Sequence, residues 1–278
     1  MDLIVGATGN VGSQVAEQLL AAGRQVRVFT RNAAKLTDGD RVEVAIGDLM
    51  QPDSFAKALE GVEAVFMMNG VLGGDAFRRL IEITKTSGSP RIVFLSTLFA
   101  ADPDSPIGRV HKDKEDVIRA SGLRHSFVRA GNFMTNTFQW LETIRRDNVV
   151  YNGTGEGKTA PVAPQDIAAV VVRALTDPNA AEIYEVTGGE LLTLREQVDT
   201  FSRVTGKSIR VVELRMEEAE AGLLKAGFPP FVATAVSRSY EDIRKGKMAF
   251  VRDTVQSVKN AAPATYEAWV QSQQSRLA

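Results

Sequence analysis

The sequence has no cysteine and only two histidines, and these shortages exclude several kinds of chemistry. Without thiols there are no disulfides, thiolate zinc sites, iron–sulfur clusters or cysteine nucleophiles. Two histidines are also too few for a histidine-rich metal cage, so we predict no metal site. A chain without cysteine is compatible with a reducing cytosol.

Long apolar runs and an excess of one charge are absent as well. No stretch approaches the roughly 20 apolar residues of a membrane span, and the first apolar run, residues 3–5, is too short for a signal peptide. Lys and Arg number 33 against 34 Asp and Glu, which argues against a generally basic surface for nucleic acid. We therefore expect a cytoplasmic protein that binds neither nucleic acid nor membrane.

The first half of the chain alternates short β-branched runs with helical patterns. This alternation is typical of parallel strands joined by right-handed crossovers, with helices on both faces of the sheet. We predict an α/β, Rossmann-type doubly wound sheet with strand order 3-2-1-4-5-6 over residues 1–131. The expected strands are residues 2–6, 25–30, 41–46, 63–68, 91–96 and 124–129, and the expected helices are 10–22, 52–59, 76–86 and 112–121.

The second half is less regular and predicts a smaller α/β lobe over residues 132–278, interleaved with the first. Thr193 and Glu196 have the spacing of a capping box, which marks the start of a helix. Further helices are expected at residues 133–146, 165–175 and 266–275, and strands at 182–187 and 209–214.

A glycine-rich turn between the first strand and the first helix is the strongest functional signal. Gly6, Gly9 and Gly12 stand where a dinucleotide-binding turn needs residues without a Cβ: for the tight turn, for close approach to a pyrophosphate and for helix–strand packing. The helix N-terminus adds N–H donors and partial positive charge. We predict that this turn holds the diphosphate of a nicotinamide dinucleotide.

The end of the second strand indicates which dinucleotide is preferred. NAD-selective folds usually place a carboxylate there to bind the ribose diol, whereas this chain has Arg31 and no acid before Asp38. An arginine attracts a 2′-phosphate, so we predict NADP(H) in preference to NAD(H). The alternative is that Arg31 is only a solvated surface charge.

Other predicted cofactor contacts lie at the carboxyl ends of the parallel strands, where ligands of such sheets bind. The full predicted set is Gly6, Thr8, Gly9, Asn10, Val11, Gly12, Arg31, Asp48, Leu49, Met68, Asn69, Gly70, Ser96 and His111.

Several segments, in this order along the chain, resemble the NmrA-like group of atypical short-chain dehydrogenase/reductases. Within that group the C-terminal half, through residues 186–189 and 226–230, is most similar to the branch of bacterial NADPH-dependent quinone oxidoreductases and triphenylmethane reductases. The resemblance covers essentially the whole chain. The other segments that carry it are residues 6–12, 47–49, 58–62, 121–122, 129–134 and 166–169.

The resemblance implies a Tyr–Lys proton relay, which this chain lacks. Aligned on Glu115, the tyrosine position holds Ile107 and the lysine position holds His111. Reduction of a simple ketone needs a proton for the developing alkoxide, whereas a quinone or conjugated acceptor gives a delocalised product that water can protonate. His111 is the one candidate catalytic residue, as ribose ligand or proton donor; a surface histidine is the alternative.

The substrate is expected beside the end of the sixth strand. Asn132, Phe133, Met134 and Phe138 could form an apolar pocket with few polar anchors. The leading hypothesis is an NADPH-dependent reductase of a quinone-like or aromatic small molecule, acting as a monomer or homodimer. Two alternatives stay open: a non-catalytic NADP(H) sensor that regulates a protein partner, and a reductase or isomerase specific to one biosynthetic pathway.

Overall fold

The computed structural model describes residues 1–32, 41–68 and 73–277, which form two compact units. The first unit contains Met1–Ala101, Val110–Ala130 and Pro164–Glu185. The second contains Asp102–Arg109, Gly131–Ala163 and Val186–Ala278. The chain leaves the first unit for the second after Ala130, next to the boundary expected from the sequence. Each unit also contains a segment from the other half of the chain.

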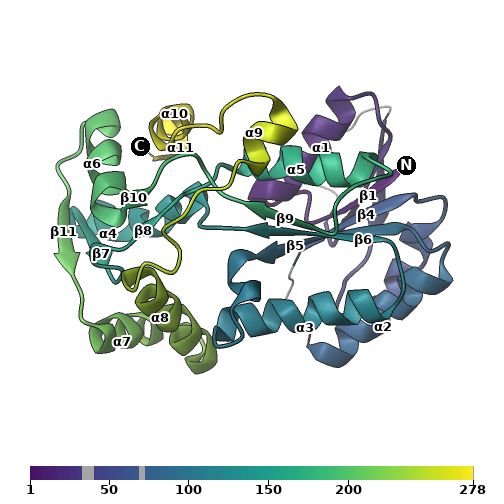
Figure 1. The fold of residues 1–278 in the computed structure, drawn as a ribbon, viewed down its shortest axis with the longest axis horizontal. Helices are drawn as coiled ribbons and strands as arrows, with labels where there is room; N and C mark the ends of the chain where they lie inside the picture. The colour runs from purple at the N-terminus through teal and green to yellow at the C-terminus, as the bar shows by residue number, and fades with distance from the viewer. Residues whose placement is uncertain (33–40, 69–72, 278) are drawn as a thin grey trace. The chain divides into compact units, whose positions relative to one another are not determined.

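The first unit is built on a seven-stranded sheet with the order β3-β2-β1-β4-β5-β6-β9 (Figure 1). The first six strands pair in parallel, so the predicted α/β doubly wound fold and its strand order are confirmed. The strand expected at residues 182–187 joins this same sheet beside β6. The strands are β1 Asp2–Val5, β2 Val26–Thr30, β3 Val42–Ile46, β4 Ala64–Met68, β5 Arg91–Thr97, β6 His125–Ala130 and β9 Ile183–Val186.

Helices cover both faces of this sheet. In Figure 1, α1 (Asn10–Ala21) and α5 (Pro164–Thr176) lie on one face, and α2 (Gly74–Thr86) and α3 (Pro106–Ala120) lie on the other. The helix expected at residues 52–59 is instead two 3-10 turns, η2 (Pro52–Phe55) and η3 (Lys57–Leu59), whose bonds join residues three apart. A further 3-10 turn, η4 (Leu98–Ala101), follows β5.

Helix α3 begins six residues earlier than the hydrophobic pattern predicts. Pro106 is its first residue, where a missing N–H costs no hydrogen bond and the fixed φ suits a helix. The hydroxyl of Ser105 accepts a hydrogen bond from the Gly108 amide at 3.1 Å, which is the geometry of an N-cap. The Ser-Pro pair therefore sets the start of α3.

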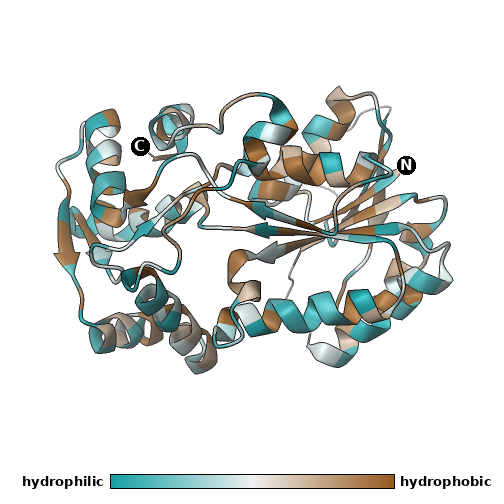
Figure 2. Ribbon diagram, viewed as in Figure 1, coloured by the Kyte–Doolittle hydropathy of each residue, from teal (hydrophilic) through white to brown (hydrophobic). Residues whose placement is uncertain are grey.

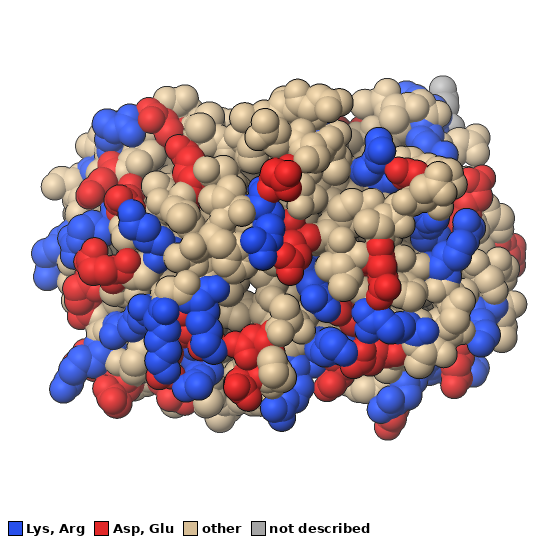
Figure 3. Space-filling view, viewed as in Figure 1, with Lys and Arg blue, Asp and Glu red and all other residues tan. Residues whose placement is uncertain are grey.

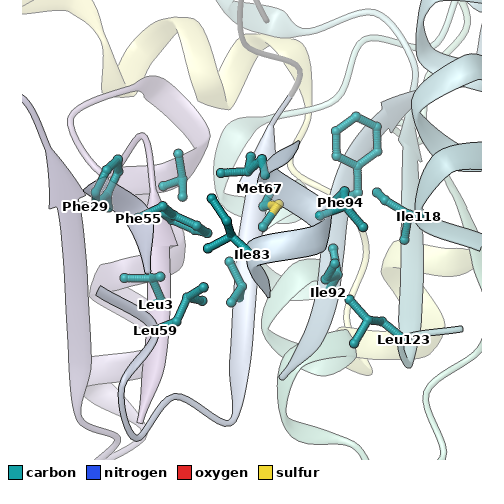
Figure 4. Close-up of a cluster of buried hydrophobic side chains, with 14 of the residues drawn as sticks. Leu3, Phe29, Phe55, Leu59, Met67, Ile83, Ile92, Phe94, Ile118 and Leu123 are labelled. Atoms are coloured by element: carbon teal, nitrogen blue, oxygen red, sulfur yellow. The ribbon is translucent and has the colours of Figure 1, made fainter. Parts of the chain in front are cut away.

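The sheet and α2 enclose an apolar cluster in which most side chains are fully buried (Figure 4). The Phe29 and Phe55 rings meet edge to face with centroids 5.0 Å apart. Burial of a side chain of this size stabilises the fold by about 1.5–3 kcal/mol. The strands are brown along most of their length in Figure 2, while α2 and α3 alternate between brown and teal, as expected for helices with one face on a core.

The second unit has two small sheets and a second apolar cluster around Phe201, Tyr266 and Trp269. β11 pairs in parallel with β7, and β10 pairs antiparallel with β8. The helix expected at residues 133–146 is a 3-10 segment followed by a short α-helix. The elements are η5 Met134–Trp140, α4 Leu141–Asp147, β7 Val149–Asn152, β8 Lys158–Thr159, β10 Leu192–Thr193, α6 Leu194–Thr205, β11 Arg210–Glu213, α7 Met216–Lys225, α8 Pro230–Arg244, α9 Thr254–Lys259, α10 Tyr266–Ser272 and α11 Gln274–Leu277.

Charges of both signs are interspersed on the face shown in Figure 3, in keeping with the net charge of -1. Among the helices that the structure describes, none is both long and apolar enough to cross a membrane.

Candidate functional site

The carboxyl ends of the parallel strands bring most predicted cofactor residues to one edge of the sheet. Gly6 follows β1, Arg31 follows β2, Asp48 comes just after β3, and Met68 is the last residue of β4. Ligands of open parallel sheets bind outside this edge. Asn69 and Gly70, also predicted there, lie outside the described residues.

The turn between β1 and α1 has the geometry that the glycines predict. Gly6 has a φ of +78°, a left-handed conformation that favours glycine. A Cβ on Gly12 would lie 2.2 Å from the Gly6 carbonyl oxygen, closer than real contacts allow. The Gly9 amide donates to that same oxygen at 2.9 Å, and α1 begins directly afterwards at Asn10. The turn is therefore compact and requires glycine at position 12.

The neighbours of this turn that the sequence predicts as cofactor contacts differ in exposure. Thr8 and Asn10 are exposed, while Val11 is buried at 2% exposure and anchors the start of α1. A Cβ on Gly6 would lie 2.7 Å from the Met68 sulfur, so Met68 lies directly beside the turn.

Arg31 is exposed at the end of β2. Within the described part of the chain, no hydrogen bond or ion pair engages its guanidinium group. Its position and its charge therefore suit an anionic ligand.

Asp48 and Leu49 lie just after β3 in a loop that hydrogen bonds and apolar contacts hold in place. The Asp48 carboxylate accepts a hydrogen bond from the Met50 amide at 2.9 Å, and the Ser54 hydroxyl donates to the Asp48 carbonyl. Leu49 packs against the first apolar cluster. A Cβ on Gly47 would lie 2.4 Å from the Phe29 ring, so this loop also needs a glycine.

A buried carboxylate on α3 joins two strands of the sheet. The Ser96 hydroxyl of β5 donates to Glu115 at 2.5 Å, and Arg129 of β6 donates to both Glu115 oxygens at 3.0 and 2.6 Å. Glu115 is fully buried, and Ser96 and Arg129 are 3% and 8% exposed. The carboxylate holds the pKa of Arg129 above its usual value. We call these three residues the Glu115 cluster.

The Glu115 cluster changes the interpretation of Ser96. The sequence predicts that Ser96 contacts the cofactor, but its hydroxyl hydrogen is engaged by Glu115. The three side chains of the cluster are far apart in sequence, and only the pairing of β5 with β6 brings them together. No local signal in the sequence identifies them.

His111 lies on α3, one turn before Glu115 and on the same face of the helix. Its ring centroid is 6.3 Å from that of Phe94 on β5. Burial, with a smaller contribution from the positive charge of Lys114, lowers the pKa of His111 from 6.5 to about 4. The imidazole is therefore neutral at physiological pH.

Lys114, beside His111 on α3, is a buried lysine. It is 7% exposed, and its ammonium group lies 5.3 Å from the centroid of the Phe77 ring. Burial lowers the pKa of Lys114.

The predicted substrate residues all lie in the second unit, and they fall into two pairs. Asn132 and Phe133 are partly exposed: the Asn132 amide donates to the Thr159 hydroxyl at 3.3 Å, and Phe133 pairs with Val162. Met134 is 2% exposed within the second apolar cluster, and Phe138 packs between Trp269 and Arg276. Core packing therefore accounts for Met134 and Phe138, whereas Asn132 and Phe133 remain candidate substrate contacts.

The residues present fit a nicotinamide dinucleotide at the strand edge. The glycine turn packs closely on itself, with no room for a Cβ at Gly12, and the N-terminal end of the twelve-residue helix α1 follows at once. These features would hold the diphosphate, and Arg31 would meet a 2′-phosphate.

Comparison with known proteins agrees with this fit. The sequence profile of a family described as NAD(P)H-binding matches residues 6–178. A (4-alkanoyl-5-oxo-2,5-dihydrofuran-3-yl)methyl phosphate reductase of Streptomyces griseus is 37% identical over 97% of this chain and 96% of its own. An NAD(P)H azoreductase of Xenophilus azovorans is 34% identical over 96% of this chain and 95% of its own.

Solved structures share the fold. The NADPH complex of an NADPH-dependent quinone oxidoreductase from Escherichia coli superposes with a TM-score of 0.86 at 24% identity, over 98% of this chain and 99% of the other. The NADP(H) complex of a Citrobacter triphenylmethane reductase gives 0.82 at 24% identity, over 99% and 100%. This chain therefore shares the fold of the branch that its sequence resembles.

Proposed function

Because this chain belongs to the NAD(P)H-binding family and is an NAD(P)H-dependent reductase, we propose that it uses NADPH to reduce a quinone-like or conjugated aromatic acceptor. The choice of acceptor rests on the environment of His111, which is partly buried on α3 near the Phe94 ring and whose pKa burial lowers to about 4. A neutral imidazole on α3 can accept or donate a hydrogen bond, but it has no imidazolium proton to release at physiological pH.

The coenzyme preference rests on Arg31. An exposed arginine at the end of β2, with no carboxylate directly after that strand, favours a 2′-phosphate over a free ribose diol. The guanidinium group presents several N–H donors in a fork that matches phosphate oxygens.

The hydroxyl groups of Ser96 and Tyr184 in the first unit support an acceptor that needs no proton from the protein. When bound, the coenzyme supplies a hydride from its reduced nicotinamide. The Ser96 hydroxyl is committed to Glu115, and Tyr184, at the opposite end of its strand from the site edge, accepts a hydrogen bond from the Ala181 amide. A ketone would form an alkoxide that needs a proton from an acid, which neither Ser96 nor Tyr184 is placed to supply. The product of a conjugated acceptor instead spreads its charge and takes its proton from water.

Two relatives with more than 30% sequence identity also support this class of acceptor. One is named for reduction of azo compounds and the other for reduction of an unsaturated furanone phosphate, and both names describe conjugated substrates. In the second unit, Asn132 could bind a polar atom of such a substrate beside the Phe133 ring.

The test is NADPH oxidation with four acceptors: a naphthoquinone, an azo dye, a triphenylmethane dye and, as a matched control, a saturated cyclic ketone. We expect turnover with at least one conjugated acceptor and a rate at least about tenfold lower with the ketone. Equal rates with the ketone would contradict the proposed acceptor class. Tight NADPH binding without oxidation by any acceptor would favour a non-catalytic sensor.

A further inference from the structure

The Glu115 carboxylate forms three short hydrogen bonds in a fully buried position. It accepts from the Ser96 hydroxyl at 2.5 Å and from two nitrogens of Arg129 at 3.0 and 2.6 Å. The Arg129 interaction is bidentate, the strongest and most directional form of an arginine–carboxylate pair. The cluster therefore leaves α3 little freedom to rotate or slide.

A buried ion pair of this kind is weak evidence for a purely stabilising role. Removing two charges from water costs several kcal/mol per ion, which their attraction often repays only in part, so apolar residues of similar volume would serve stability at least as well. Buried polar networks instead specify one arrangement of the elements that they join. Here the elements are α3, β5 and β6.

The arrangement that the cluster fixes includes His111. His111 and Glu115 are four residues apart on α3, so their side chains lie one above the other on the same helix face. The centroids of His111 and Phe94 are 6.3 Å apart, and Phe94 stands two residues before Ser96 on β5. A shift of α3 relative to β5 would therefore move His111 directly.

We propose that Glu115 is a positioning residue that holds His111 in the orientation needed to contact the nicotinamide half of the coenzyme. The inference rests on the proposed function for the identity of that ligand. It also gives Ser96 a different role, in which its hydroxyl orients the carboxylate on α3 and does not touch coenzyme or substrate.

The first test observes His111 without any turnover. The chain has two histidines, so the ring signals in an NMR spectrum can be assigned with one His125→Gln variant. Ser96→Ala removes one hydrogen bond from Glu115 and keeps the Arg129 pair. Ser126→Ala is the matched control, because it removes another buried hydroxyl, which donates to the Ala181 carbonyl at 2.7 Å.

We expect Ser96→Ala to shift or broaden the His111 signal and to leave His125 unchanged. Ser126→Ala should leave the His111 signal unchanged. Only the signal of the adjacent His125 is expected to change in this variant. An unchanged His111 signal in Ser96→Ala, or an equal response of His111 to both variants, would overturn the proposal.

The second test asks whether Glu115 acts through His111. In a double-mutant cycle, Ser96→Ala should lower kcat for NADPH-dependent reduction of a naphthoquinone about tenfold in the wild-type background. In the His111→Ala background it should lower kcat less than about twofold, because the group being positioned is gone. A purely structural role would give the same loss in both backgrounds.

Glu115→Gln is the stronger variant, and Asp2→Asn is its control. Asp2 is also fully buried and paired with Arg24 at 2.6 and 3.0 Å, at the opposite edge of the sheet. Both variants should lower the stability of the fold, but only Glu115→Gln should shift the His111 signal and lower kcat. Equal effects on His111 would contradict the inference. Absence of turnover by the wild-type protein would contradict the proposed function. The NMR comparison would then decide whether Glu115 positions His111.

Discussion

At the scale of single residues, the proposed choice of acceptor depends on the charge state of His111, whose pKa burial lowers. Its neutrality follows from burial against the sheet and from the neighbouring Lys114. The sequence places His111 at the lysine position of a familiar relay, but it does not show the burial that removes the proton. That information depends on how α3 packs.

The lowered pKa of His111 predicts a pH-dependent stability. The unfolded chain binds a proton near pH 6.5, while the folded chain resists it down to about pH 4, so stability is complete above pH 6.5 and is lost as the pH falls through this window. At pH 5.0 the loss is about 2 kcal/mol.

Urea unfolding at pH 7.5 and 5.0 measures this loss. His111→Gln, which cannot titrate, should lose about 2 kcal/mol less than wild type between the two pH values, since all other groups are shared. The same loss in both proteins would contradict the buried neutral state.

Arg31 predicts a loss of coenzyme selectivity. Arg31→Ala should raise the Kd for NADPH by about ten- to a hundredfold, because one charge-assisted contact with the 2′-phosphate is worth roughly 1.5–3 kcal/mol. The Kd for NADH should stay unchanged. Fluorescence titration measures both, with Arg173→Ala, another exposed arginine, as the control. An unchanged ratio of the two Kd values would reduce Arg31 to a surface charge.

At the scale of helices and strands, the sequence predicts the parallel sheet well because buried strands and amphipathic helices have distinct periods. The first residue of a helix is harder to predict when a capping residue marks it and hydrophobic periodicity does not, as the Ser105 cap of α3 shows. The sequence also does not reveal the 3-10 segment at Met134–Trp140, because its apolar residues match a helical pattern that the backbone does not follow.

The spacing of Thr193 and Glu196 predicts the capping box of α6 correctly. The Thr193 hydroxyl accepts from the Glu196 amide at 3.1 Å, and the Glu196 carboxylate accepts from the Thr193 amide at 2.7 Å. Thr193→Ala should lower the free energy of unfolding by about 1 kcal/mol. Urea unfolding checks this value, and a change below about 0.3 kcal/mol would show that the cap contributes little.

At the scale of the whole molecule, the sequence predicts a coenzyme site at the carboxyl ends of the strands, but it does not predict how the chain divides into two units. The first unit takes Pro164–Glu185 from the second half of the sequence, which adds α5 and most of β9 to the sheet domain. Nothing local in that segment distinguishes it from the residues around it. The Glu115 cluster escapes prediction for the same reason, since three distant positions meet only after the strands have paired.

The central claim is that the β1–α1 turn binds the diphosphate of NADPH, and calorimetric titration of NADPH into wild type and Gly12→Ala tests it most directly. The added Cβ would lie 2.2 Å from the Gly6 carbonyl oxygen, so the turn must open. We expect clear binding heat for wild type and an affinity for NADPH at least about a hundredfold lower for Gly12→Ala. Circular dichroism checks that the variant is still folded. No heat for wild type with NADPH or NADH, or equal affinity of both proteins, would contradict the account.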